Sequence, residues 1–200
     1  MSDSRWFVLA VLGVWLLAAT AVGAADLLVD LVPPWPQVIL ISLTLLSLVC
    51  LWRVGPVRRW ATRVDVRVFV AFHLTRFVGI YFLVLYGRGE LPYEFAVIGG
   101  WGDIIVAMLA IPLIAMGPPE GRRRTPYLAW NVVGLADILF VVATATRLAL
   151  ADPASLAPML RLPLSLLITF VVPIVIATHI WLFRRLREGD HVAGATPDQL

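Results

Sequence analysis

The stretch Val66–Tyr86, VRVFVAFHLTRFVGIYFLVLY, decides the fold of this chain. A helix rises about 1.5 Å per residue and the hydrocarbon core of a bilayer is about 30 Å thick, so a spanning helix needs roughly 20 mostly apolar residues. Val66–Tyr86 meets this requirement, and it places His73 and Arg76 inside the span. An ionisable side chain in hydrocarbon is unfavourable unless it is paired or hydrated, so the stretch also predicts a polar site within the membrane.

The composition of the whole chain agrees with a membrane location. Of its 200 residues, 60% are hydrophobic and 14% are charged, and the mean hydropathy is +0.90. So few charges cannot cover a water-facing surface, which excludes soluble enzymes, nucleic-acid-binding proteins and disulfide-rich secreted domains. All 16 basic residues are arginine, which excludes lysine Schiff-base chemistry, and the single Cys50 allows no internal disulfide.

Similar apolar runs fill the rest of the chain and predict an all-α, integral membrane six-helix bundle with short loops. The predicted spans are residues 6–25, 38–54, 66–86, 95–116, 127–150 and 162–183. Residues 1–187 then form a single transmembrane domain, and residues 188–200 are predicted to be a disordered cytoplasmic tail. The first run also fits a cleavable signal peptide, because small residues follow its apolar stretch, but its length favours a retained span.

The distribution of arginine predicts the orientation, because arginine-rich loops are retained in the cytoplasm. The second and fourth connections and the C-terminal end carry most of these residues: Arg53, Arg58, Arg59, Arg63, Arg67, Arg122, Arg123, Arg124, Arg184, Arg185 and Arg187. The opposite loops hold only Arg88, Arg147 and Arg161. With Arg5 ahead of the first run, both termini are predicted to be cytoplasmic.

Three charged residues are predicted to share the middle of the membrane. Counting the helical rise from the span ends places Arg76 and Asp137 near the midplane and Asp103 slightly to the outer side. Gly99, one turn before Asp103, is predicted to let a neighbouring backbone approach that carboxylate. One aspartate would neutralise the guanidinium while the other holds or exchanges a proton. The alternative is a structural clamp that fixes helix register.

Two histidines, His73 and His179, are predicted to share a second depth nearer the cytoplasmic face, with Asn131 beside them. Two neutral imidazoles at a matched depth can serve as the axial ligands of a b-type haem, which is one interpretation of the pair. In the other interpretation the histidines only make hydrogen bonds. A divalent metal is disfavoured, because Arg76 would repel the cation. Head-group chemistry with His179 as acid or base is a further alternative, but the sequence has no established catalytic motif, so an enzyme is not the favoured interpretation.

Several of these features occur together: Arg76 with Gly79, the run Gly99-Gly100-Trp101-Gly102-Asp103, Trp130-Asn131 with Gly134 and Asp137, and Pro173 with His179. In this combination the chain resembles a group of small bacterial polytopic membrane proteins for which no function is known. The resemblance covers roughly Phe69 to Leu186. It implies a bacterial inner-membrane location and brings no activity with it.

The sequence therefore favours transport of a small solute or of protons through a polar site between spans three to six. The candidate site residues are Arg76, Asp103, Asp137, His73, His179 and Asn131. The alternatives are a haem-binding electron-transfer protein with His73 and His179 as ligands, and a non-enzymatic membrane subunit or assembly factor. The expected partners are the lipid bilayer and a small solute or proton, and the sequence does not distinguish a partner subunit from a homo-oligomer.

Overall fold

The computed structural model describes the backbone of residues 2–193 and the side chains of residues 3–187, and every element in this part of the chain is helical. Six of the described helical segments are long and apolar enough to cross a membrane: Asp3–Ala24, Trp35–Arg53, Val66–Gly87, Glu94–Met116, Gly121–Ala151 and Leu167–Arg187. They confirm the predicted all-α architecture of a multi-pass membrane protein. The sixth span starts later than predicted, because Leu162–Leu164 form a turn around Pro163.

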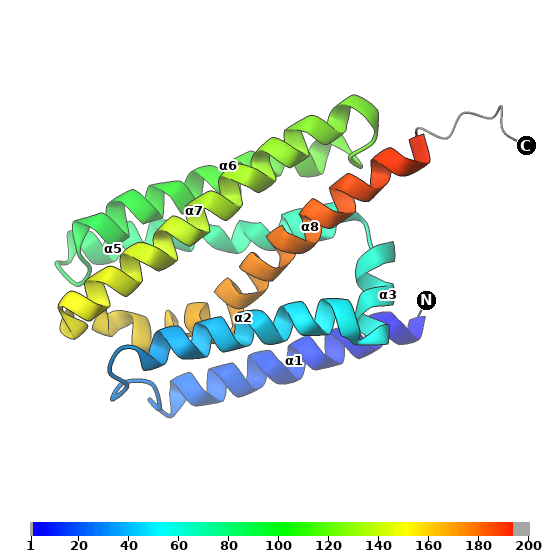
Figure 1. The fold of residues 1–200 in the computed structure, drawn as a ribbon. Helices are drawn as coiled ribbons and strands as arrows, with labels where there is room; N and C mark the ends of the chain where they lie inside the picture. The colour runs from blue at the N-terminus through cyan, green and yellow to red at the C-terminus, as the bar shows by residue number, and fades with distance from the viewer. Residues whose placement is uncertain (1, 194–200) are drawn as a thin grey trace, which may run out of the picture.

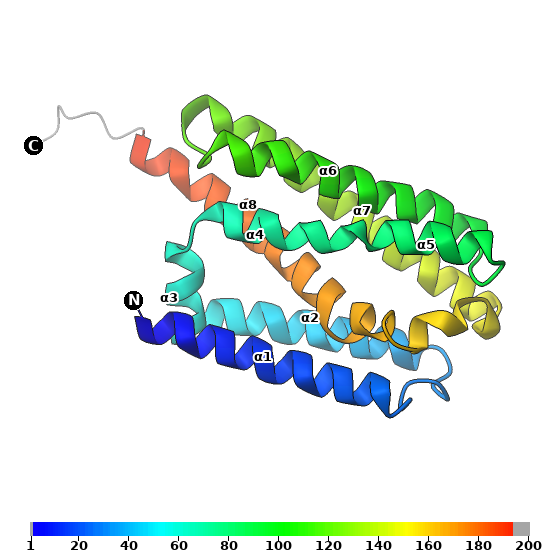
Figure 2. The same cartoon turned by 180° about the vertical axis from the view of Figure 1, so that it is seen from behind.

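The helices pack in two groups with α8 (Val172–Ala193) between them. Figures 1 and 2 show α1 (Ser2–Ala24) and α2 (Trp35–Arg53) on one side and α6 (Gly100–Met116) and α7 (Arg124–Ala151) on the other. The helix α8 crosses obliquely between the groups and contacts both α2 and α7. This helix therefore joins the two halves of the molecule.

The third span is not a continuous α-helix. It consists of α4 (Val66–Phe72), the 3₁₀ segment η1 (His73–Phe77) and α5 (Val78–Gly87). Side chains three residues apart eclipse each other in a 3₁₀ helix, so His73 and Arg76 project in the same direction. Tight helical geometry in the middle of a span often marks a functional position.

The fourth and sixth spans begin with wide, π-helical turns, η2 (Glu94–Gly99) and η5 (Leu167–Val171). Pro173 follows η5 and has no N–H to donate to the carbonyl of Thr169, one turn earlier. The indole Nε1 of Trp15 donates to that carbonyl at 2.9 Å. The freed carbonyl thus anchors α1 to the start of the sixth span.

The connection between the second and third spans contains a helix, α3 (Gly55–Arg63), where the sequence predicts a short loop. Its buried Ala61 offers a carbonyl that accepts hydrogen bonds from Trp181 Nε1 at 3.1 Å and from Arg185 at 2.8 Å. Arg185 also donates to the Val64 carbonyl at 2.9 Å. These α8 side chains satisfy carbonyls at the end of α3, which explains why nine residues form a helix here.

The connections rich in arginine meet at one end of the bundle, which we call the arginine-rich end. In Figure 1 the start of α1, the helix α3, the α6–α7 connection with η3 (Gly121–Arg123) and the last turns of α8 lie together on the right. The opposite end holds residues 25–34, residues 88–93 and η4 (Pro153–Leu160). Of the tail that the sequence predicts to be disordered, residues 188–193 continue α8, residues 194–200 lie outside the described residues, and the disorder of residues 194–200 stays a prediction.

Candidate functional site

Arg76, Asp103 and Asp137 form a charge cluster between three spans, in which Arg76 and Asp103 are buried and Asp137 is partly exposed. Arg76 lies in η1 and is 2% exposed. Its Nε donates to Oδ1 of Asp103 on α6 at 2.6 Å, one terminal nitrogen donates to the Gly134 carbonyl of α7 at 2.9 Å, and the other donates to Oδ2 of Asp137 on α7. The structure therefore brings together the three charged residues that the sequence places at one depth.

Glycine residues allow the helices to approach this cluster closely. A Cβ added to Gly79 of α5 would overlap the backbone carbonyl oxygen of Gly100 on α6 and would lie 3.1 Å from the Cβ of Asp103. A Cβ on Gly102 would overlap the Asp137 carboxylate. The expectation for Gly99 was wrong, because Gly99 faces the Val141 side chain, and Gly79 and Gly100 make the close backbone contact instead.

The charge cluster contains more acidic groups than basic groups. One guanidinium faces two carboxylates, and the guanidinium keeps its proton at any accessible pH. With both carboxylates ionised, the site would hold one negative charge in excess, which a low-dielectric interior disfavours. A proton or a bound cation is what balances such a cluster.

His73 and His179 form a second buried group, which we call the histidine pair. Their ring centroids are 4.1 Å apart with an angle of 53° between the rings. Trp130 packs against both rings, with centroid distances of 5.0 Å to His73 and 5.4 Å to His179. Both histidines are completely buried. The two residues predicted to share a depth are thus in direct contact.

The hydrogen bonds of the histidine pair identify which nitrogens carry protons when both rings are neutral. The Asn131 amide nitrogen donates to the His179 carbonyl at 3.0 Å, so its Oδ1 accepts from His179 Nδ1 at 2.8 Å. The Thr178 hydroxyl donates to the Ile174 carbonyl and therefore accepts from His73 Nε2 at 3.1 Å. The remaining nitrogens, His73 Nδ1 and His179 Nε2, have no partner among the described residues. Both are bare lone pairs that can accept a proton.

The histidine pair does not fit a haem. A metal–imidazole bond is about 2 Å long, so two axial imidazoles keep their ring centroids on the order of 6 Å apart across the porphyrin plane. The observed 4.1 Å leaves no room for that plane. The described part of the chain also contains no group of three residues that could hold a metal ion.

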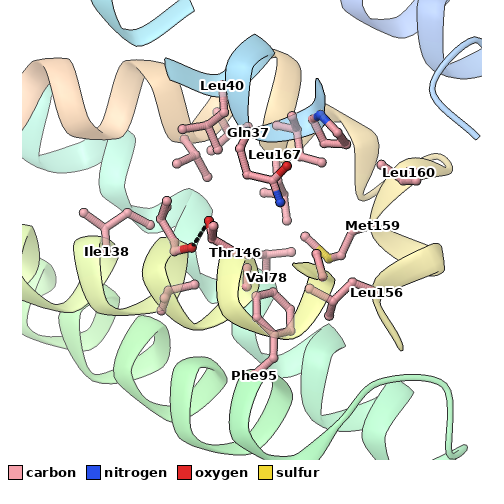
Figure 3. Close-up of a pocket in the computed structure, with 18 of the residues that line it drawn as sticks. Gln37, Leu40, Val78, Phe95, Ile138, Thr146, Leu156, Met159, Leu160 and Leu167 are labelled. Carbon is pink, nitrogen blue, oxygen red and sulfur yellow. Dashed lines mark hydrogen bonds between the residues drawn. The ribbon is translucent and has the colours of Figure 1, made fainter. Parts of the chain in front are cut away.

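An apolar cavity extends from the opposite end of the bundle to the charge cluster. It is partly open to the surroundings, and its empty volume of about 1070 Å³ includes that open space. Figure 3 shows residues from α2, α7 and η4 around it, with the amide of Gln37 pointing inward between Thr146 and Met159. Arg76 and Asp103 both line this cavity, whereas His179 and Asn131 do not.

The cavity, the charge cluster and the histidine pair follow one another along the bundle. Arg76 belongs to the cavity wall and also donates to the Gly134 carbonyl. A Cβ on Gly134 would lie 2.6 Å from Cε1 and 2.9 Å from Nε2 of His179, so the imidazole packs directly on this glycine. Along α7, Asn131 precedes Asp137 by about 9 Å, toward the arginine-rich end. The cluster thus separates an apolar cavity from a buried proton-accepting pair.

Two contributors to this arrangement were absent from the sequence-based set of site residues. Thr178 holds His73 in one tautomer, and Gln37 reaches the cavity from α2, outside spans three to six. Thr178 directly precedes His179, which was its only available signal. Nothing in the local sequence around Gln37 distinguishes it from a polar residue at a span end.

Comparison with known proteins gives a family but no activity. No curated protein and no solved structure matches the chain. One protein family, described as Domain of unknown function (DUF8737), matches residues 33–187. The match contains spans two to six and with them the charge cluster, the histidine pair and the cavity lining except Leu31. The chain belongs to the family of domains of unknown function DUF8737.

Proposed function

We propose that this protein moves protons across the membrane, coupled to a small solute, through the charge cluster between spans three to six. The observation that carries the proposal is the continuous series from the cavity through Arg76 and Gly134 to the histidine pair. Intramembrane ionisable residues with partners on several helices are typical of proton-coupled sites in transporters.

Each group has a distinct role in this proposal. Asp103 takes up a proton from the cavity, because its Oδ2 accepts no hydrogen bond from the described residues and the residue lines the cavity. Arg76 keeps its charge and holds both carboxylates in place. Proton uptake by one carboxyl removes the excess negative charge of the cluster, and proton release restores it.

On the other side of the cluster, the bare nitrogens of His73 and His179 receive the proton. His73 precedes Arg76 by three residues in η1, which corresponds to about 6 Å along the axis. In this proposal a water molecule bridges the carboxylates of the cluster and the bare imidazole nitrogens. The histidine pair thus serves as the next proton acceptor toward the arginine-rich end.

The proposal also includes the orientation of the protein in the membrane. The arginine-rich end faces the cytoplasm of a bacterial cell and the protein lies in the inner membrane, because arginine-rich connections are retained on the cytoplasmic side. The cavity then opens in the outer half of the membrane, and the histidine pair lies in the cytoplasmic half.

The test is proton flux in liposomes that contain the purified protein and a trapped pH-sensitive dye. Asp103→Asn is expected to abolish pH-driven flux while the protein still purifies as a single species, because the neutral amide cannot take up a proton from the cavity. Asp137→Asn is expected to abolish flux as well, because a cluster with one carboxylate has no excess negative charge for a proton to balance. Asp30→Asn, an exposed aspartate between the first two spans, is the matched control and is expected to keep wild-type flux. Wild-type flux in both Asp137→Asn and Asp103→Asn would refute the proposal.

One observation favours a second candidate, a non-enzymatic subunit whose charges only orient helices. Arg76 donates to acceptors on both α6 and α7, as expected of a clamp that fixes helix register. This candidate predicts that the exchanged pair Arg76→Asp with Asp137→Arg keeps function and that a partner protein co-purifies. Head-group chemistry has no such support, since His179 and Asn131 are completely buried and bonded to each other.

A further inference from the structure

We infer that the apolar cavity binds an amphipathic organic cation, with its ammonium group against Asp103 and its apolar body between α2, α7 and η4. The inference deepens the proposed function by naming the class of solute. The claim that the cation is moved rests on the proposed function, whereas the claim that it binds does not.

The cavity walls fit an apolar body. They are formed almost entirely by aliphatic and aromatic side chains from seven helical elements, such as Leu40, Phe82, Ile138, Leu156 and Val171. Two polar lining residues have their hydroxyls occupied, because Thr75 donates to the Phe72 carbonyl and Thr146 to the Val142 carbonyl, each at 2.8 Å. A ligand therefore finds few polar partners in this space, and their positions determine its orientation.

The charged end of the cavity favours a cation over an anion. Arg76 donates hydrogen bonds to Asp103, Asp137 and a backbone carbonyl, so its charge is already shared between two carboxylates. Asp103 lines the cavity with Oδ2 unbonded within the described residues, whereas Asp137 does not line it. An ammonium group at Asp103 balances the excess negative charge, and a ligand carboxylate would increase it.

The opposite side of the cavity provides a second contact. The Oε1 atom of Gln37 is buried and has no hydrogen-bond partner among the described residues. Figure 3 shows its amide directed into the cavity. A buried acceptor without a donor is costly, so a ligand that donates a hydrogen bond here gains affinity. An amine ligand with a second N–H or O–H group matches both ends of the space.

Cation and proton compete for the same carboxylate. The ionisable groups that face Asp103 are Arg76 from η1 and Asp137 from α7, and the neighbouring helix α5 places Gly79 beside the Asp103 Cβ. A proton on Asp103 removes the attraction for an ammonium group, so binding of one releases the other. Because of this competition, an organic cation that crosses the membrane in either direction is exchanged for a proton, and no redox step is needed.

The test compares three ligands of one shape in isothermal titration calorimetry on the detergent-purified protein: 4-phenylbutylamine, 4-phenylbutanol and 4-phenylbutyrate. The amine is expected to bind at least about tenfold more tightly than the alcohol, and the carboxylate more weakly than both. Asp103→Asn is expected to remove the preference for the amine while leaving the alcohol unchanged. Asp30→Asn is the control and keeps the preference.

A second variant covers the case in which Asp103→Asn does not purify as a single species. Gln37→Leu lies at the cavity wall away from the charge cluster and is expected to weaken binding of an amine with a second donor, 4-(4-hydroxyphenyl)butylamine, several-fold more than binding of 4-phenylbutylamine. Equal affinity of amine and alcohol in the wild type, or tighter binding of the carboxylate, overturns the inference. Amine binding without any proton flux refutes only the proposed function, and proton flux without amine selectivity refutes only the inference.

Discussion

The close contact between α5 and α6 at Gly79 makes a quantitative prediction. In Gly79→Ala, the new Cβ overlaps the Gly100 carbonyl oxygen and lies 3.1 Å from both the Gly100 carbonyl carbon and the Asp103 Cβ. Backbone atoms cannot rotate away as the end of a side chain can, so the two helices must separate. Separation also moves Asp103 away from Arg76, whose Nε now donates to it at 2.6 Å.

The expected cost follows from these contacts. Overpacking costs about 1–3 kcal/mol, and a backbone overlap belongs at the upper end of this range. Alanine returns about 1 kcal/mol through its higher helix propensity, so the net loss in the free energy of unfolding is about 2 kcal/mol. Denaturant unfolding in detergent micelles, followed by tryptophan fluorescence, measures this difference.

Gly87→Ala is the matched control, because Gly87 lies in the same helix and a Cβ there would meet nothing within 4 Å. This variant is expected to be as stable as the wild type or more stable by up to about 1 kcal/mol. If Gly79→Ala unfolds at the same denaturant concentration as Gly87→Ala, the argument from close approach is wrong. Reduced proton flux in Gly79→Ala alone would further link this contact to the charge cluster.

Two further substitutions test separate contacts by the same unfolding assay. Gly134→Ala places a Cβ 2.6 Å from Cε1 of His179, so a loss of about 1–3 kcal/mol is expected, and Gly13→Ala, with nothing within 4 Å, is expected to show none. Equal stability of these two variants would contradict the packing of His179 on Gly134. Asp65 caps α4 by accepting from the Arg67 backbone N–H at 2.8 Å, and the hydrogen bond from the Arg67 side chain holds the pKa of Asp65 below its usual value. Asp65→Ala is therefore expected to cost about 0.5–2 kcal/mol at neutral pH. A lowered pKa in the folded state gives stabilisation that is present above the usual pKa and disappears as the pH falls through the lowered value. The stabilities of the wild type and Asp65→Ala should therefore converge in strong acid. A constant difference in stability at every pH would refute the role of the carboxylate.

The tertiary structure was needed to reveal several features that no local pattern indicates. The helix α3 exists because Trp181 and Arg185, more than 100 residues away, donate to its last carbonyls. The 3₁₀ geometry of η1 and the π-helical turns of η2 and η5 change the direction of side chains along a span. A count of residues along an ideal helix cannot include such changes, because they depend on the packing of neighbouring helices.

The sequence by itself determined the number of apolar helices long enough to span a membrane and their approximate ends, and it predicted a common depth for the charged residues. These follow from two constants, the thickness of the bilayer and the rise of a helix, which depend on no contact between segments. Only the tertiary structure decided which side chains meet. It put Arg76 between Asp103 and Asp137, and it brought the histidine rings to 4.1 Å, too close for the haem that equal depth had suggested. Depth in the membrane is a property of one helix, whereas contact depends on the rotation and tilt of each helix, which are set by the packing of all of them.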